Sequence, residues 1–173
     1  VLKDAVGYTQ LAFSLAPGSS CTLPAKAAIL HCAFTVEALA NNLIQFVSVG
    51  ARLADSIEKL DPIGKIELFA LLMRKSSEFN RGAKCIQTFA SLIKVRNWYV
   101  HPKIFTQKLD DGTIALDDLQ YPTLQQLGIK FSPEKWNQSD SACALKALVI
   151  AIDELLLDVL KLEMKSMSCM FYD

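Results

Sequence analysis

Residues 24–48, PAKAAILHCAFTVEALANNLIQFVS, decide the fold class of this chain. Apolar residues recur there every three to four positions, which is the spacing of one face of an α-helix. The recurring positions are Ile29, Cys32 and Ala33, Val36, Leu39 and Ala40, Leu43, and Phe46 and Val47. The stretch therefore predicts one long helix whose inward side packs into a core, with Gly50 ending or bending it.

The same spacing predicts four more helices. They are expected at about residues 2–15, 61–77, 83–100 and 139–165. Asp61 can cap the helix that follows it, because its carboxylate accepts hydrogen bonds from free backbone N–H groups. The cluster at residues 139–141 can cap the last helix in the same way, and Pro102 stops the helix before it.

The pattern changes after Pro102. Short apolar runs flank the turn residues Asp110, Asp111 and Gly112, and this arrangement indicates a β-hairpin. The predicted fold is all-α: an antiparallel bundle of about five helices in a single domain, residues 1–173. A small β-hairpin, with strands near residues 103–118, is expected as an insertion at residues 103–121.

The composition excludes several classes of protein. The chain has 173 residues, 51% of them apolar, and 18 basic residues balance 18 acidic ones. Such a chain is a packed globular domain rather than a disordered one. It carries no excess of positive charge for general binding to duplex DNA. The high apolar fraction either fills the core or leaves apolar surface for a partner.

Charges interrupt the most apolar stretches, so no membrane span is expected. The start of the chain does not resemble a signal peptide, which favours a cytoplasmic location. The five cysteines are widely spaced and predict buried thiols in a reducing compartment. No pair has Cys-x-x-Cys spacing, so neither a metal nor another cofactor is expected.

The helix predicted at residues 83–100 breaks its own apolar pattern near its end. Its inward side should continue through positions 96 and 97, which are Arg96 and Asn97. An arginine there is costly unless it is paired or faces a cleft. His101, one of two histidines, follows at the helix end. Arg96 and His101 are about 140° apart on an ideal helix, so they converge only if the helix unwinds or a second subunit contributes.

Arg96 and His101 suit the chemistry of a phosphodiester. A guanidinium binds phosphate oxygens and stabilises charge that develops on phosphorus. An imidazole with a pKa near 6.5 transfers protons at neutral pH. RNA supplies its own nucleophile in the 2′-hydroxyl, so the reaction needs no metal in principle.

Residues 95–102, VRNWYVHP, resemble the HEPN superfamily motif, in which four to six residues separate an arginine from a histidine. Members are helical bundles, commonly dimeric, and many are metal-independent endoribonucleases in toxin, phage-defence and RNA-processing systems. The resemblance implies a homodimer in which Arg96 stabilises the phosphorane and His101 is the general acid or base. Asn97 would position the phosphate or the histidine. The implied products are a 2′,3′-cyclic phosphate and a 5′-hydroxyl.

Other residues are candidates for supporting roles. Glu37 either orients Arg96 or His101, or simply pairs with Arg96 inside the bundle. Asn41 lies one turn further along the same helix and is expected near the cleft. Three residues beside the motif are candidates for contact with RNA: Trp98, Tyr99 and Lys103. The two aromatic residues could instead be core or dimer contacts. His31 has apolar neighbours and is interpreted as a structural histidine.

Two other functions remain open at this point. One is a non-catalytic helical interaction module, in which Arg96 forms a buried ion pair and the apolar surplus binds a partner protein. The other is a nucleotide-binding HEPN-like subunit that works with a separate nucleotidyltransferase. An antitoxin is a further possible partner. The nuclease requires Arg96 and His101 to be accessible in one groove, whereas the interaction module would bury and pair them.

Overall fold

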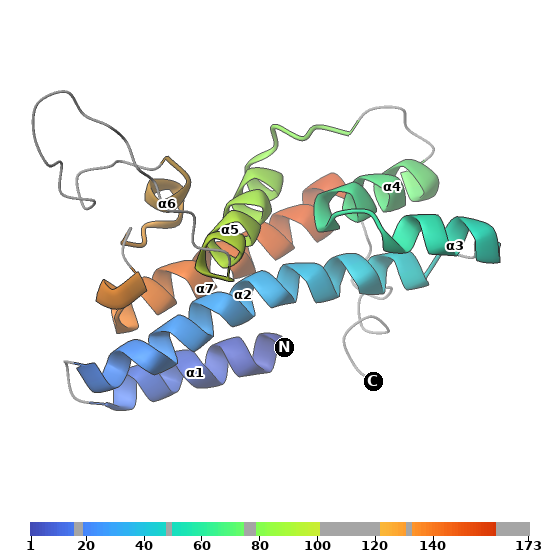
Figure 1. Cartoon of the computed structure of the whole chain (residues 1–173). Coiled ribbons are helices and arrows are strands. Elements are labelled where there is room, and N and C mark those ends of the chain that lie inside the picture. Colours follow the sequence, from blue (N-terminus) through green and yellow to red (C-terminus); the bar gives the residue numbers. More distant parts are fainter. Residues whose placement is uncertain (16–18, 48–49, 75–78, 101–121, 131–132, 162–173) are drawn as a thin grey trace, which may run out of the picture.

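The computed structural model describes residues 1–15, 19–47, 50–74, 79–100, 122–130 and 133–161. Within them the chain forms seven α-helices and no β-strand, which confirms the all-α class (Figure 1). The helices are α1 (Leu2–Ser14), α2 (Ser19–Gln45), α3 (Ala51–Glu58), α4 (Pro62–Arg74), α5 (Lys84–Val100), α6 (Pro122–Leu127) and α7 (Gln138–Glu154). A 3₁₀ turn, Pro133–Lys135, precedes α7, and a π-helical turn, Leu155–Val159, extends it.

The helix α2 is the centre of the fold. It contacts α1, α4, α5 and α7, and Figure 1 shows α1 lying along it on one side with α5 and α7 on another. Large side chains from these helices are fully buried between them, among them Ile29, Phe69, Phe89 and Leu148. Each such side chain contributes roughly 1.5–3 kcal/mol when it leaves water, so α2 is fixed by packing along its length.

The predicted helices are confirmed in place, but their number and ends differ. The described chain has two short helices more than the expected five, α3 and α6, which span 8 and 6 residues. Both are shorter than the window of about 11–18 residues over which an apolar repeat is counted in a sequence. Asp61 caps the start of α4 as predicted, since its Oδ1 accepts a hydrogen bond from the Gly64 N–H at 3.0 Å. Gly50 does not end α2, which stops at Gln45; it is the N-cap of α3.

The last helix begins with a cap that the sequence prediction placed wrongly. Asn137, not the cluster at residues 139–141, is the N-cap, and its side chain accepts hydrogen bonds from Ser139 and Asp140 N–H groups. Asp140 returns a bond by accepting the Asn137 N–H at 2.9 Å. Several residues in this segment have side chains that can cap a helix. The backbone angles select which of them is the cap, and these angles cannot be read from residue type.

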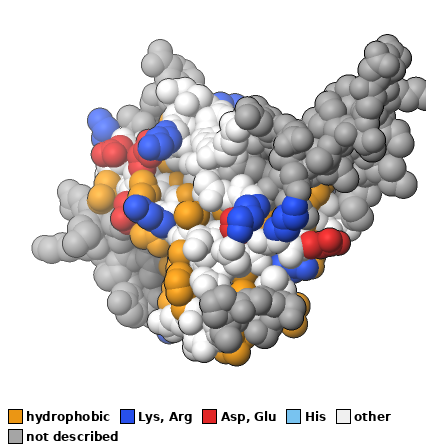
Figure 2. All heavy atoms as spheres, turned by 90° about the vertical axis from the view of Figure 1, so that its left-hand side faces the viewer, with side chains coloured by type: hydrophobic (Ala, Val, Ile, Leu, Met, Phe, Trp, Pro, Cys, Tyr) orange, Lys and Arg blue, Asp and Glu red, His pale blue; other side chains and the backbone are white. Residues whose placement is uncertain are grey.

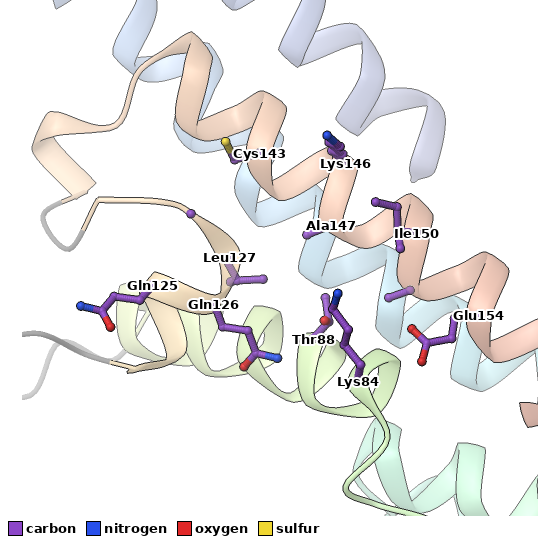
Figure 3. A pocket seen from close by; sticks show the side chains of 12 residues that line it. Lys84, Thr88, Gln125, Gln126, Leu127, Cys143, Lys146, Ala147, Ile150 and Glu154 are labelled. Carbon is purple, nitrogen blue, oxygen red and sulfur yellow. The ribbon is translucent and has the colours of Figure 1, made fainter.

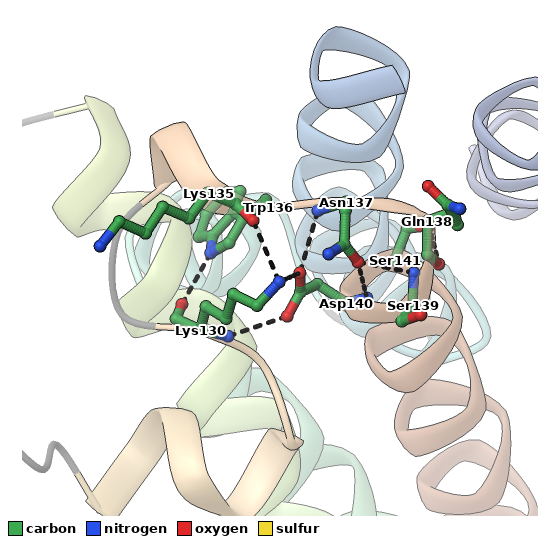
Figure 4. A network of polar contacts seen from close by, with 8 residues as sticks. All are labelled: Lys130, Lys135, Trp136, Asn137, Gln138, Ser139, Asp140 and Ser141. Carbon is green, nitrogen blue, oxygen red and sulfur yellow. Dashed lines mark hydrogen bonds and ion pairs between the residues drawn. The ribbon is translucent and has the colours of Figure 1, made fainter. Parts of the chain in front are cut away.

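Asp140 also holds the segment before α7 against the fold (Figure 4). Its Oδ1 accepts the Lys130 N–H at 3.0 Å, and its Oδ2 lies 3.4 Å from the Lys130 ammonium. The indole N–H of Trp136 donates to the Lys130 carbonyl at 2.7 Å. Trp136 is fully buried, and its ring stacks on Tyr99 of α5 at 6.0 Å. The end of α5 is therefore tied to the start of α7.

Several expectations fall outside the described residues. These are the hairpin at residues 103–121, the chain beyond residue 161, and Cys169. Among the other cysteines, Cys21, Cys32 and Cys85 are buried as predicted. Cys143 is exposed, contrary to the prediction. It lies on the outward side of α7, whereas the apolar residues next to it in the sequence point to other sides of the helix.

The segment Cys21–Gln45 of α2 has the length and mean hydropathy, 1.4, of a helix that could cross a membrane. Half of its most apolar window is buried inside the fold. The core helix of a soluble protein passes the same test, so this property does not decide where the protein acts.

Burial of Cys32 predicts a pH dependence of stability. Loss of hydration raises the pKa of the Cys32 thiol from 9.0 to about 12. Between these values the unfolded chain releases the thiol proton and the folded chain keeps it, so stability falls as the pH rises. We expect urea unfolding to show a loss of about 1.4 kcal/mol per pH unit that Cys32→Ala lacks. Cys143→Ala, the control at an exposed site, should show the same loss of stability with pH as wild type. If the free energy of unfolding falls equally steeply with pH in wild type and Cys32→Ala, the effect does not come from the Cys32 thiol.

Candidate functional site at the end of α5

Arg96 and Asn97 lie near the end of α5, where Asn97 begins the last turn and Arg96 directly precedes it. The buried face of this helix includes Ile86, Phe89, Leu92 and Val95, so it passes beside position 96 rather than through it. The Arg96 side chain is 24% exposed. The arginine therefore lies at the edge of the core, where one side of the guanidinium packs and the other can meet solvent.

An ion pair with α2 holds this arginine. The Nη2 atom of Arg96 contacts the Oε1 atom of Glu37, whose side chain is 28% exposed. The Nη1 atom of Arg96 donates a hydrogen bond to the Asn97 side-chain oxygen at 2.7 Å. The predicted contact of Glu37 with Arg96 is thus present. A planar guanidinium held at two nitrogens has a fixed orientation.

The guanidinium is not fully satisfied by these contacts. Its Nε is buried and has no hydrogen-bond partner among the described residues. Its central carbon lies 5.9 Å from the centroid of the Phe34 ring on α2, within the range of a cation–π contact. Arginine carries five N–H donors, and because Nε is buried, the donors left for an incoming anion are the second N–H groups of Nη1 and Nη2.

Asn41 lies elsewhere. Its side-chain oxygen accepts a hydrogen bond from the Lys65 ammonium of α4 at 2.8 Å. Both residues line a pocket of about 610 Å³ that also includes Gln45 on α2 and Ile57 and Glu58 on α3. One further turn of α2 thus directs Asn41 toward α4 instead of α5, and the structure does not bring it to Arg96.

The aromatic residues of the motif have neighbours inside the fold. Trp98 is half-buried and packs against the hydrophobic core. Tyr99 is 37% exposed, and its ring stacks on Trp136 at an interplanar angle of 21°. His101 and Lys103 lie outside the described residues. Within the described chain, the motif therefore contributes Arg96 and Asn97 to the site.

The sequence interpretation missed a set of rings next to Arg96. His31 lies between Tyr8 of α1 and Phe34 of α2, with ring centroids 5.1 and 5.8 Å away. Its Nδ1 is 3.9 Å from the Asp4 carboxylate. Spacing along α2 could have indicated that His31 and Phe34 share a face. The contact with Tyr8 depends on how α1 packs on α2.

A second pocket, of about 310 Å³, lies between α5, α6 and α7 (Figure 3). Lys84 and Lys146 line it beside Glu154, Thr88 and the exposed Cys143. Lys84 is in the first turn of α5 and Arg96 is near the end of the helix, about 18 Å further along the axis. This pocket is therefore separate from the site at Arg96.

Charge is mixed on the molecular face in Figure 2. Lys and Arg side chains stand there in small groups, several beside Asp or Glu, among hydrophobic and uncharged side chains. No group of three or more His, Cys, Asp or Glu residues in the described ranges could hold a metal ion. Comparisons with protein-family models, curated proteins and solved structures gave no match.

Proposed function

We propose that this chain is a metal-independent endoribonuclease of the HEPN type, acting as a homodimer in the cytoplasm in toxin, phage-defence or RNA-processing chemistry. The observation that carries the proposal is the state of Arg96. It is oriented by Glu37 and Asn97, partly exposed, and five residues from His101. An arginine that served the core alone would be buried and saturated by its partners.

The geometry suits stabilisation of a transition state. As the 2′-oxygen of RNA attacks the neighbouring phosphorus, negative charge develops on the non-bridging phosphate oxygens. A donor fixed before the reaction stabilises that charge without the cost of reorganisation. The Glu37 contact supplies this fixation, and the remaining N–H donors of Arg96 are the groups that would bind the phosphate.

His101 completes the chemistry in this proposal. As general base it removes the proton from the 2′-hydroxyl, or as general acid it delivers a proton to the leaving 5′-oxygen. A bond forms between the 2′-oxygen and phosphorus, and the bond from phosphorus to the 5′-oxygen breaks. The products are a 2′,3′-cyclic phosphate and a 5′-hydroxyl. By the resemblance, two subunits bring their motifs to one cleft.

The experiment is incubation of the purified protein with RNA in EDTA. Wild type should cleave, and His101→Ala and Arg96→Ala should each lose the activity. Arg81→Ala is the matched control, because Arg81 also pairs with a glutamate, Glu67, but lies on a different part of the surface. Cleavage that survives both motif substitutions would overturn the proposal, as would intact RNA with a protein shown to be dimeric by light scattering.

One observation favours a second function, a non-catalytic interaction module. Arg96 already has an intrachain partner in Glu37, and exposed apolar side chains such as Leu11, Phe13 and Leu23 could contact another protein. That partner would be an antitoxin, a nucleotidyltransferase or another protein. A dimer that leaves RNA intact, and whose Arg96→Ala variant loses only stability, would support this alternative.

A further inference from the structure

Four side chains from three helices form a continuous row at the surface. Tyr8 of α1, His31 and Phe34 of α2, and Arg96 of α5 follow one another at 5.1, 5.8 and 5.9 Å. We call these four residues the aromatic row. Its end at Arg96 is the candidate site, and its other end is Tyr8.

Each member of the row is partly accessible. Tyr8 is 38% exposed and Phe34 37%, and the side chains of His31 and Arg96 are 28% and 24% exposed. Large rings in partial contact with water offer π faces and edges to a flat apolar partner. The row is therefore a surface rather than part of the core.

We propose that the aromatic row binds unpaired bases of single-stranded RNA next to the phosphate held at Arg96. The inference rests on the proposed function, because it assigns the row to the substrate of that same site. Aromatic side chains beside an arginine are how proteins hold single-stranded nucleic acid, with bases on the rings and a phosphate on the cation.

The charges around the row favour bases over phosphates along most of its length. The Asp4 carboxylate lies beside His31, and Glu37 neutralises part of the charge on Arg96. These two anions oppose a phosphate backbone beside His31 and on the Glu37 side of Arg96, and leave the other N–H donors of Arg96 for one phosphate. The chain is also neutral overall. Affinity must then come from stacking, so binding should depend only weakly on salt.

The row also selects against duplex RNA. Bases in a duplex are stacked on one another and cannot lie on protein rings, whereas unpaired bases can. Tyr99 and Trp98 are weaker candidates for this role, because one stacks on Trp136 and the other packs on the core. The substrate class is therefore RNA with an unpaired segment at the cleaved bond.

The test measures binding separately from cleavage. A fluorescent single-stranded oligonucleotide of 2′-O-methyl RNA has its nucleophile blocked, and its binding can be followed by anisotropy. Phe34→Ala and Tyr8→Ala should each weaken binding about 5- to 100-fold. The matched control is Phe46→Ala. Phe46 is also exposed, at 49%, and it lies just beyond the end of α2, about 18 Å from Phe34 along the helix axis.

Further variants separate stacking from a loss of folding. Phe34→Leu keeps apolar packing and should still bind poorly, whereas Phe34→Trp should restore binding. Thermal unfolding of each variant checks that the fold is intact. Wild-type affinity in Phe34→Leu and Tyr8→Ala, equal affinity for duplex RNA, a steep salt dependence, or no binding by wild type would each overturn the inference.

The outcomes for binding and for cleavage are distinguishable. If the oligonucleotide binds through the row but unmodified RNA stays intact, the nuclease proposal fails and the row is a single-strand binding surface. If unmodified RNA is cleaved and the row variants keep the wild-type KM, the inference about the row fails and the nuclease proposal stands.

Discussion

Arg96→Ala is expected to lower kcat/KM for RNA cleavage by about 10²–10³-fold, the usual cost of removing one donor that stabilises developing charge. The physical reason is that Arg96 alone among the described residues of the motif offers a cation to the phosphate. Arg96→Lys should recover little activity, because an ammonium lacks the planar fork that Glu37 and Asn97 orient. Single-turnover kinetics in EDTA measure the chemical step directly.

Substitution of Glu37 provides a control that separates the effect of Arg96 on cleavage from its effect on the stability of the fold. In Arg96→Ala the half-buried Glu37 carboxylate loses its partner, which should cost about 1–2 kcal/mol of stability. Adding Glu37→Gln removes that charge and should restore part of the stability without restoring cleavage. If Arg96→Ala keeps wild-type kcat/KM, or if the double variant regains activity together with stability, Arg96 has only a structural role.

Trp136→Ala is expected to lower the free energy of unfolding by about 3–5 kcal/mol. The side chain is fully buried, its indole N–H donates to the Lys130 carbonyl at 2.7 Å, and its ring stacks on Tyr99. Removal leaves a cavity and an unsatisfied carbonyl between α5 and α7. Urea denaturation of the variant measures the loss.

Glu134→Ala, at the neighbouring exposed position, should change stability by no more than about 0.5 kcal/mol. Trp136→Phe keeps a smaller aromatic ring and loses the indole hydrogen bond, so its stability should lie between those of wild type and Trp136→Ala. A loss below about 1 kcal/mol in Trp136→Ala would show that the end of α5 does not depend on this contact.

The sequence was sufficient for the fold class and for the long helices, because apolar periodicity records directly which face is buried. The sequence was not sufficient for the short helices, or for the helix cap, whose position depends on backbone geometry. The helix α3 spans only 8 residues, fewer than the window of about 11–18 residues over which an apolar repeat is counted. The cap of α7 is Asn137, although Ser139 and Asp140 are equally good capping residues.

The site could be predicted only in part. Glu37 and Arg96 each lie at the edge of the buried face of their helix, so packing α2 against α5 brings them together, and the contact is present. Asn41 is one turn beyond Glu37 and meets Lys65 instead, because α2 passes from α5 to α4 within that distance. The contact of Tyr8 with His31 depends on the packing of α1, which sequence spacing does not contain.

The chemical identity of the cut ends tests the proposed reaction most directly. Wild-type protein incubated with RNA in EDTA should leave 2′,3′-cyclic phosphate and 5′-hydroxyl ends. His101→Ala should leave none, and a substrate with 2′-deoxyribose at the cleaved position should stay intact. Ends that carry a 5′-phosphate, a requirement for added metal, or equal cleavage of the 2′-deoxy substrate would contradict attack by the 2′-hydroxyl at an Arg96 and His101 site.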